Sequence, residues 1–473
     1  MATADEVIQN LPWRWNTQGL IFVICGLGFM FDAWEVVLTG FVIPLLATSD
    51  WHVSKLELGL FGSAGLIGMA VGAFAWGSIA DLIGRKRAFM YTMLVYSIFS
   101  LLCALAPTYT LLLIFRFIAG LGLGGFIPVD YSVVSEFTPS KNRGTVLTAL
   151  DVWWPIGGTL CGLVATLLAP YHNWRLLFGL MALPALMVFW VRTAIPESPL
   201  YLIRAGRREE ARAVVQRLIE RVKVTVPAWT LPEAAREAST TRTLFTQFRA
   251  IWSYNLKITA GSWLLFMSNL LLYYGVVTWL PTILVSEGYK AYAAFLVTTL
   301  LTAIGIVGVL VSAWLVEVIG RRWVVAVGGV LAAISMYIFT LQLHLPTMAQ
   351  TWILVFGFTT ELVLPAIQAY VPELYPTLLR GTGFGWASTM SRVCAGLVPI
   401  IFGSWLWPVF GLANTFGVIG LFVLVSIVWM WAAMPETKGK LLDHVGEEGV
   451  AVQVAEPALQ YPQGGSSEEG GSY

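Results

Sequence analysis

Charged side chains are scarce in this 473-residue chain: Asp, Glu, Lys and Arg make up 12% of it, against 57% hydrophobic residues. The mean hydropathy is +0.75. A water-soluble protein of this length could not bury so much apolar surface. The net charge of +1 offers no broad basic surface for nucleic acid. The composition therefore predicts a protein that resides in a lipid bilayer and has no nucleic-acid partner.

Cysteine is scarce as well, and patterns typical of metal, nucleotide or nucleophile chemistry are missing. The cysteines lie far apart and form no Cys-x-x-Cys or Cys/His cluster, which argues against disulfides and a metal site. The glycines of 120–125 match a dinucleotide-binding loop only superficially, because that loop follows a strand in a βαβ unit. We therefore expect neither an enzyme nor a bound metal or cofactor. The four cysteines are Cys25, Cys103, Cys161 and Cys394.

Long apolar stretches dominate the chain instead. A helix needs about 20 apolar residues to cross the hydrocarbon core, and these stretches are too continuous for the alternating strands of a membrane β-barrel. They predict an all-α membrane protein with twelve transmembrane helices in two pseudo-symmetric bundles of six. The twelve stretches are residues 19–46, 57–82, 86–106, 109–137, 142–170, 174–194, 256–286, 291–318, 322–343, 349–374, 380–409 and 412–434.

Four regions follow from this division. We expect an N-terminal six-helix bundle over 1–194 and a C-terminal one over 256–437. Between them, 195–255 is expected to be a cytoplasmic linker with amphipathic helices. The remaining residues, 438–473, are rich in Gly, Glu and Ser and are expected to form a largely disordered cytoplasmic tail.

Positive charge in the short loops predicts the orientation. The loops on the cytoplasmic side of a membrane protein carry an excess of Lys and Arg. We therefore expect a multi-pass protein of the inner or plasma membrane with both termini in the cytoplasm. The loops on one side carry Arg85, Lys86, Arg87, Lys141, Arg143, Arg321, Arg322 and Arg380, and those on the other carry Lys55 and Lys290.

The two halves share motifs. Gly77–Arg87 reads Gly-Ser-Ile-Ala-Asp-Leu-Ile-Gly-Arg-Lys-Arg, and Ala313–Arg322 ends similarly, in Glu-Val-Ile-Gly-Arg-Arg. Pro-Glu-Ser at 196–198 returns as Pro-Glu-Thr at 435–437. A repeat of such long period indicates two homologous halves. In a membrane, two parallel halves predict a transporter that rocks about a site between them.

The repeated loops form a candidate cytoplasmic gate of turn glycines, basic side chains and nearby acids. Such side chains can exchange ion-pair partners as the halves move, although each surface pair is weak. An ordinary positively charged loop is the alternative. The candidates are Asp81, Gly84, Arg85, Arg87, Glu136 and Arg143 in the first half and Glu317, Arg321, Arg322, Glu373 and Arg380 in the second.

Three charged residues inside the first bundle are candidates for proton coupling. Asp32 and Glu35 are three positions apart in the first span and share one helix face. Charges at membrane depth are costly and point to function, and two close carboxylates there are expected to hold at least one proton. Arg116 in the fourth span needs a carboxylate partner, and we expect Asp32 to provide it. A neutral acid that is merely hydrogen-bonded is the alternative.

Arg392 in the eleventh span is a candidate for anion binding, because its planar guanidinium suits carboxylates. A standing ion pair with Glu361 of the tenth span is the alternative. Asp151 in the fifth span has either a substrate or proton role or a structural one. Amide, phenol and indole groups complete the candidate substrate site: Trp34, Trp154, Asn269, Tyr273 and Tyr274.

Together these motifs resemble the major facilitator superfamily over nearly the whole chain outside the tail. Asp32–Glu35 and Gly120–Glu136 are most similar to the synaptic vesicle protein 2-like group, which includes bacterial niacin permeases and other metabolite–proton symporters. The resemblance implies two six-helix bundles and alternating access. It also implies that Asp32 and Arg116 form a coupling pair, as in proton-coupled sugar porters, and that Arg392 binds an anionic substrate, as in organic-anion transporters.

The leading hypothesis is a monomeric, proton-coupled importer of a small aromatic organic acid such as nicotinate, with the proton as its coupling ion. An alternative is a proton antiporter that exports organic cations or drugs, recognised by Glu35 and Asp151. A sugar symporter is less favoured, because the glutamine pairs of sugar porters are not evident in the fifth and seventh spans. A receptor that does not transport is the last alternative, and the intact Asp32, Arg116 and repeated loops argue against it.

Overall fold

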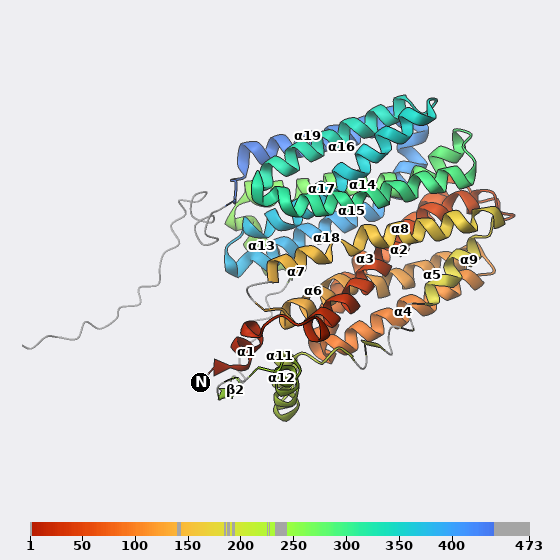
Figure 1. Cartoon of the computed structure of the whole chain (residues 1–473). Helices are drawn as coiled ribbons and strands as arrows, with labels where there is room; N and C mark the ends of the chain where they lie inside the picture. The colour runs from red at the N-terminus through yellow and green to blue at the C-terminus, as the bar shows by residue number, and fades with distance from the viewer. Residues whose placement is uncertain are drawn as a thin grey trace, which may run out of the picture.

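The computed structural model describes residues 2–438 except 140–142, 184–185, 187–189, 192–193, 225, 227 and 232–243. Long helices run side by side through the molecule (Figure 1). The first half contains α2 (Leu20–Ala47), α3 (Lys55–Ile83), α4 (Arg85–Leu105), α5 (Tyr109–Leu123), α6 (Phe126–Phe137), α7 (Arg143–Leu150), α8 (Trp153–Leu168) and α9 (Trp174–Gly179). The second half contains α14 (Leu256–Ser286), α15 (Ala291–Val318), α16 (Arg321–Leu341), α17 (Pro346–Glu373), α18 (Thr377–Ile401) and α19 (Trp407–Ala433).

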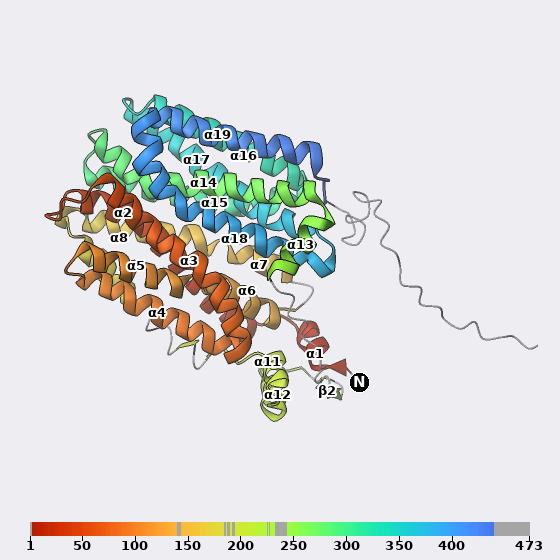
Figure 2. The ribbon, with the colours of Figure 1, turned by 180° about the vertical axis from the view of Figure 1, so that it is seen from behind.

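Shorter elements gather at the end of the bundle where the N-terminus lies (Figure 2). There β1 (Ala2–Thr3) pairs in parallel with β2 (Trp229–Thr230). The amphipathic helix α12 (Arg208–Val222) buries its apolar face and packs against α1 (Ala4–Asn10) and η1 (Trp15–Gly19). The other short helices are α11 (Pro199–Arg204) and α13 (Leu244–Tyr254). Part of the expected linker, and the expected tail beyond Lys438, lie outside the described residues.

Nine helices in the described part of the chain are long and apolar enough to cross a membrane. Two expected spans are divided, the fourth into α5 and α6 and the fifth into α7 and α8. The second break has a local cause, because Pro155 lacks the N–H that would bond the Asp151 carbonyl one turn earlier. The sixth span contains α9 and several residues that are not described.

The two ends of the bundle differ. One end carries the turns at Gly84 and Gly320 and the arginines that follow them, and we call it the basic end. We call the opposite end the closed end. Gly84 has a φ of 98° and Gly320 a φ of 97°, values that strain any residue with a side chain. The repeated motif therefore folds into the same turn, with a positive φ at its glycine, in both halves.

At the closed end the halves touch backbone to backbone. The approach of α3 to α18 is so close that a Cβ added at Gly59 would lie 2.9 Å from the Pro399 carbonyl oxygen. Nearby, the Ile400 N–H donates a hydrogen bond to Ser63 Oγ at 3.2 Å. No side chain lies between the backbones here, so α3 and α18 are in direct contact at this end.

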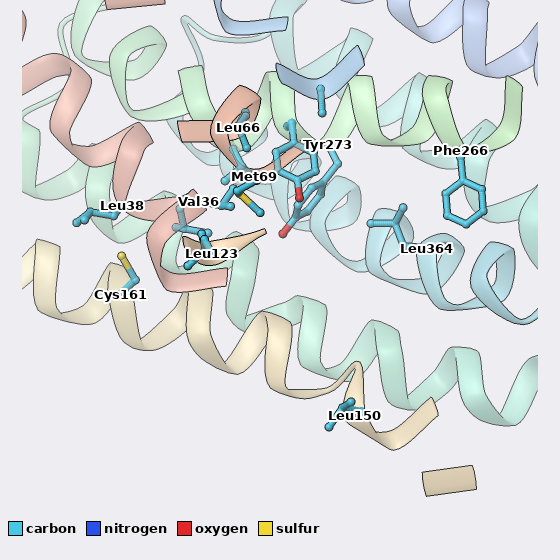
Figure 3. Close-up of a cluster of buried hydrophobic side chains, with 14 of the residues drawn as sticks. Val36, Leu38, Leu66, Met69, Leu123, Leu150, Cys161, Phe266, Tyr273 and Leu364 are labelled. Carbon is cyan, nitrogen blue, oxygen red and sulfur yellow. The ribbon is translucent and has the colours of Figure 1, made fainter. Parts of the chain in front are cut away.

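Elsewhere the halves meet through side chains. Figure 3 shows Val36 and Met69 of the first half and Tyr273 of the second, which belong to one buried apolar cluster. Nearer the basic end, the rings of Phe74 and Trp386 lie 6.3 Å apart. Side chains can change rotamer, so this contact separates more readily than the backbone contact at the closed end.

Candidate functional site

The buried arginine of the first half is held by Glu35. Arg116 of α5 forms an ion pair with Glu35 of α2, and each side chain is 3% exposed. Arg116 Nη2 also donates to the Glu35 carbonyl oxygen at 3.2 Å and to the Thr39 hydroxyl. The rings of Phe61 and Phe178 lie 5.6 and 5.5 Å from the guanidinium carbon. The guanidinium is therefore neutralised and enclosed.

The expectation that Arg116 pairs with Asp32 is wrong in this structure. Glu35 and Thr39 are one helical turn apart, on the part of α2 that Arg116 reaches. Asp32 lies nearly one turn before Glu35, closer to the basic end. Asp32 is fully buried, and neither of its oxygens has a hydrogen-bond partner in the described part of the chain. Arg392 of α18, in the other half, interacts electrostatically with Asp32.

Arg392 has no carboxylate partner among the ion pairs of the described residues. Its Nη1 donates to Ser388 Oγ at 2.8 Å, and its side chain is half-buried. The alternative of a standing Glu361–Arg392 pair is thus not present in this conformation. Glu361 is buried, and its Oε1 has no hydrogen-bond partner in the described part of the chain. Arg392 therefore keeps donors for a further anion.

Aromatic side chains from both halves meet within electrostatic reach of Arg392. Trp154 of α8 donates from Nε1 to the Tyr273 hydroxyl of α14 at 2.9 Å. The Trp154 ring lies 6.3 Å from Tyr274 and 5.5 Å from Phe29 of α2. We call Phe29, Trp154, Tyr273 and Tyr274 the aromatic cluster; Tyr274 interacts electrostatically with Arg392. Flat apolar surface next to a guanidinium suits a ligand that has both a ring and a carboxylate.

Asp151 connects the halves near the break between α7 and α8. The Tyr131 hydroxyl of α6 donates to Asp151 Oδ1. With its amide assigned so that the nitrogen donates, Gln368 of α17 reaches both Asp151 oxygens at 3.2 Å. In this conformation Asp151 is therefore satisfied by protein donors from both halves.

Two predicted substrate residues lie apart from this group. Trp34 packs on Phe31 of its own helix with ring centroids 6.1 Å apart. Asn269 donates from Nδ2 to the Leu265 carbonyl one turn earlier, at 2.9 Å. Among the hydrogen bonds and ring contacts of the described residues, neither side chain reaches Arg392.

The repeated turns at the basic end are built alike. Glu197 accepts a hydrogen bond from the Lys86 N–H at the start of α4, at 3.1 Å. Glu436 accepts from the N–H groups of Arg321 and Arg322 at the start of α16, at 3.1 and 3.0 Å. Unpaired N–H groups at a helix N-terminus favour a carboxylate. The repeated Pro-Glu-Ser and Pro-Glu-Thr motifs thus cap the helix that follows each turn glycine, a role that the sequence did not reveal.

Ion pairs of the candidate gate lie within each half. Arg85 Nε is 3.7 Å from Glu136. Arg321 Nη2 is 2.9 Å from Glu317 and 3.1 Å from Glu373. No ion pair among the described residues joins the two halves at this end.

The other gate candidates have less definite partners. Arg87 is exposed, and Arg380 Nε and Nη2 have no hydrogen-bond partner in the described part of the chain. The side chains of Asp81 and Arg143 lie outside the described residues.

Sequence reasoning missed Asp130 of α6, which is fully buried. The signal was available, since an acid inside the fourth span falls under the same rule that singled out Asp32. It also missed Gln368, for which no signal existed, because its role depends on a contact between the halves. No group of His, Cys, Asp and Glu suited to a metal ion occurs among the described residues.

Comparison with known proteins identifies the family. Residues 20–448 match the family model described as sugar (and other) transporter. The niacin transporter of Acinetobacter baylyi is 34% identical over 440 residues, which cover 93% of this chain and 98% of that protein. The gallate transporter of Pseudomonas putida is 29% identical over 424 residues, which cover 88% of this chain and 91% of that protein.

A solved structure supports the same assignment. The xylose transporter of E. coli, in a partially occluded inward-open conformation, matches with a TM-score of 0.73 and 17% identity over 90% of this chain and 99% of that one. At this identity the match establishes the fold, which confirms the predicted all-α, twelve-helix membrane architecture. The chain belongs to the sugar (and other) transporter family and is a transporter of the major facilitator superfamily.

Proposed function

We propose that this protein imports a small aromatic monocarboxylate such as nicotinate together with protons, as a monomer that works by alternating access. The observation that carries the proposal is Arg392, a half-buried guanidinium without a carboxylate partner in the described chain, beside the aromatic cluster. The named substrates of two relatives, niacin and gallate, are aromatic carboxylates. We place the basic end and both termini in the cytoplasm, as the positive-inside rule predicts.

Asp32 would couple the proton to the substrate through Arg392. An ionised Asp32 attracts the Arg392 guanidinium and repels the carboxylate of a substrate. A protonated Asp32 does neither, so the guanidinium is free for the substrate. Proton and anion then favour each other's binding, which is the thermodynamic requirement of symport. Arg116, which is neutralised by Glu35, takes no direct part in this exchange.

The antiport of organic cations receives less support from the geometry. That alternative needs Glu35 and Asp151 as free anionic ligands. Glu35 is paired with Arg116, and Asp151 accepts hydrogen bonds from Tyr131 and, with the amide assigned as above, from Gln368. Neither acid is open to a cation in this conformation.

Ligand-induced thermal stabilisation of the purified protein tests the proposal. Nicotinate and benzoate should raise the melting temperature, and more so at acidic than at neutral pH, because a bound ligand stabilises the folded state according to its concentration over Kd. Arg392→Ala should weaken nicotinate binding roughly 30-fold, or about 2 kcal/mol, through loss of a charge-assisted hydrogen bond. Arg217→Ala removes an exposed arginine of α12 and should leave binding unchanged.

Choline and glucose serve as cationic and sugar probes in the same assay. Stabilisation by choline alone would overturn the proposal in favour of cation transport. Unchanged nicotinate affinity in Arg392→Ala would remove Arg392 from the substrate site.

A further inference from the structure

Asp130 of α6 is a second buried acid of the first half that has no hydrogen-bond partner among the described residues. It is fully buried, and neither carboxyl oxygen accepts a hydrogen bond from a described residue. An ionised carboxylate without a partner is very costly in such a place, so the group persists as a neutral acid or as one that exchanges its proton. The coupling scheme above makes no use of this group.

Gly28 of α2 makes room for the Asp130 carboxyl. A Cβ added at Gly28 would lie 2.9 Å from Asp130 Oδ2 and 3.1 Å from Cε2 of Phe89 in α4. Gly28 precedes Asp32 by four residues, so Asp130 lies about one helical turn, ~6 Å, from Asp32 along α2. That spacing exceeds a hydrogen bond, but one water molecule or one side-chain rotation can bridge it.

The position of Asp130 along the bundle is also informative. In α2 the chain runs from the basic end at Leu20 toward the closed end at Ala47, so Gly28 lies on the basic side of Asp32. In α6 the chain runs from Asp130 to Phe137 at the basic end. Asp130 therefore lies between Asp32 and the basic end.

The groups that face Asp130 do not neutralise it. From α2, the Cys25 thiol and the Asp32 carboxyl lie within electrostatic reach, and Tyr131 follows Asp130 in α6. None of the three carries a positive charge. The helices α1, α3, α4 and α7 also pack against α6, and they add no cation within that reach in the described part of the chain.

We propose that Asp130 is a second proton-binding carboxylate, which passes the coupling proton between Asp32 and the basic end. The proposal rests on the proton-coupled transport proposed above. In each cycle the Asp32 carboxyl gives its proton to the Asp130 carboxylate, and Asp32 becomes the anion that attracts Arg392. The Asp130 carboxyl then releases the same proton to water at the basic end and returns to its carboxylate form. One proton moves in each step, and it leaves with the substrate.

Proteoliposomes test this role through two readouts for radiolabelled nicotinate, and they are loaded with buffer for the first and with unlabelled nicotinate for the second. One is accumulation driven by an inward pH gradient, and the other is counterflow exchange at equal pH, which needs no net proton movement. Asp130→Asn should reduce accumulation roughly tenfold more than counterflow and flatten the pH profile of accumulation. Glu220→Gln, which changes an exposed acid of α12, should leave both rates unchanged. If the wild type and Asp130→Asn show the same gradient-driven accumulation relative to counterflow, the proposal is overturned.

Infrared spectroscopy supplies a second measurement that does not require the Asp130 variant to fold. In the triple variant Asp32→Asn/Asp151→Asn/Glu361→Gln, Asp130 remains as a buried acid without a hydrogen-bond partner in the described part of the chain, and the C=O band of a protonated carboxylic acid should persist and titrate with pH. Absence of a titrating band in that variant would overturn the proposal. If the wild type itself shows no gradient-driven accumulation, the proposed proton coupling fails. If the wild type accumulates nicotinate and Asp130→Asn does so equally well, only the relay through Asp130 is refuted.

Discussion

At the scale of single residues, partners distinguish the two acids of α2. Glu35 is paired with Arg116 and accepts a hydrogen bond from the Tyr96 hydroxyl at 3.2 Å. Asp32, three positions earlier, has no hydrogen-bond partner in the described chain. Removing one member of a buried ion pair leaves an uncompensated charge, whereas removing an unpartnered acid does not. The two acids should therefore respond oppositely to neutralisation.

Glu35→Gln should destabilise the protein by about 3 kcal/mol, because Arg116 is left buried without its counter-ion. Asp32→Asn should leave the stability unchanged or raise it, because the amide removes the cost of a buried acid without a partner. Thermal unfolding in detergent, followed by intrinsic tryptophan fluorescence, gives the ranking, with Glu220→Gln as the surface control. A larger loss in Asp32→Asn than in Glu35→Gln would mean that Asp32 is the true partner of Arg116.

At the scale of elements, each repeated turn joins two helices and depends on one glycine. Gly320 ends the connection from α15 and precedes α16, whose first N–H groups are capped by Glu436. A Cβ on Gly320 would lie 2.8 Å from Glu436 Oε2. The conformation and the cap therefore both require glycine at this position.

Gly320→Ala should lower the stability by about 1–2 kcal/mol, since an L-residue is strained at positive φ, and should also weaken the cap on α16. Gly385→Ala is the matched control, because Gly385 lies within α18, is exposed and has open space around its Cβ position. There alanine should be neutral or stabilising by about 0.5–1 kcal/mol. Equal melting temperatures for the two variants would show that the turn tolerates a side chain.

At the scale of the whole molecule, the fold was predictable and the partners within it were not. Hydropathy reveals spans because the bilayer demands a fixed length of apolar helix, and repeated motifs reveal two halves. The partner of Arg116 depends on how α2 and α5 are shifted relative to each other along the bundle. The spacing of three residues between Asp32 and Glu35 does not determine that shift. The contact of Asp151 with Gln368 lies between the halves and leaves no local pattern in either.

The close approach at Gly59 leads to a prediction about the transport cycle itself. Alternating access requires the closed end to seal in one state and to part in the other. Even a Cβ at Gly59 would lie 2.9 Å from the Pro399 carbonyl oxygen, so a larger side chain prevents the backbones of α3 and α18 from meeting. Gly59→Trp should therefore hold the closed end apart, abolish uptake of radiolabelled nicotinate and still permit its binding.

Leu56→Trp is the matched control, because Leu56 lies at the same end of α3 and is 51% exposed. It should transport like the wild type. Both variants and Gly59→Ala are measured in two assays. Uptake into proteoliposomes reports a block in the transport cycle, and ligand-induced thermal stabilisation reports whether the protein is folded and binds nicotinate. Uptake should fall in the order wild type, Ala, Trp, because each larger side chain makes the sealed state less accessible. Normal uptake in Gly59→Trp would mean that the contact between α3 and α18 is not part of the cycle.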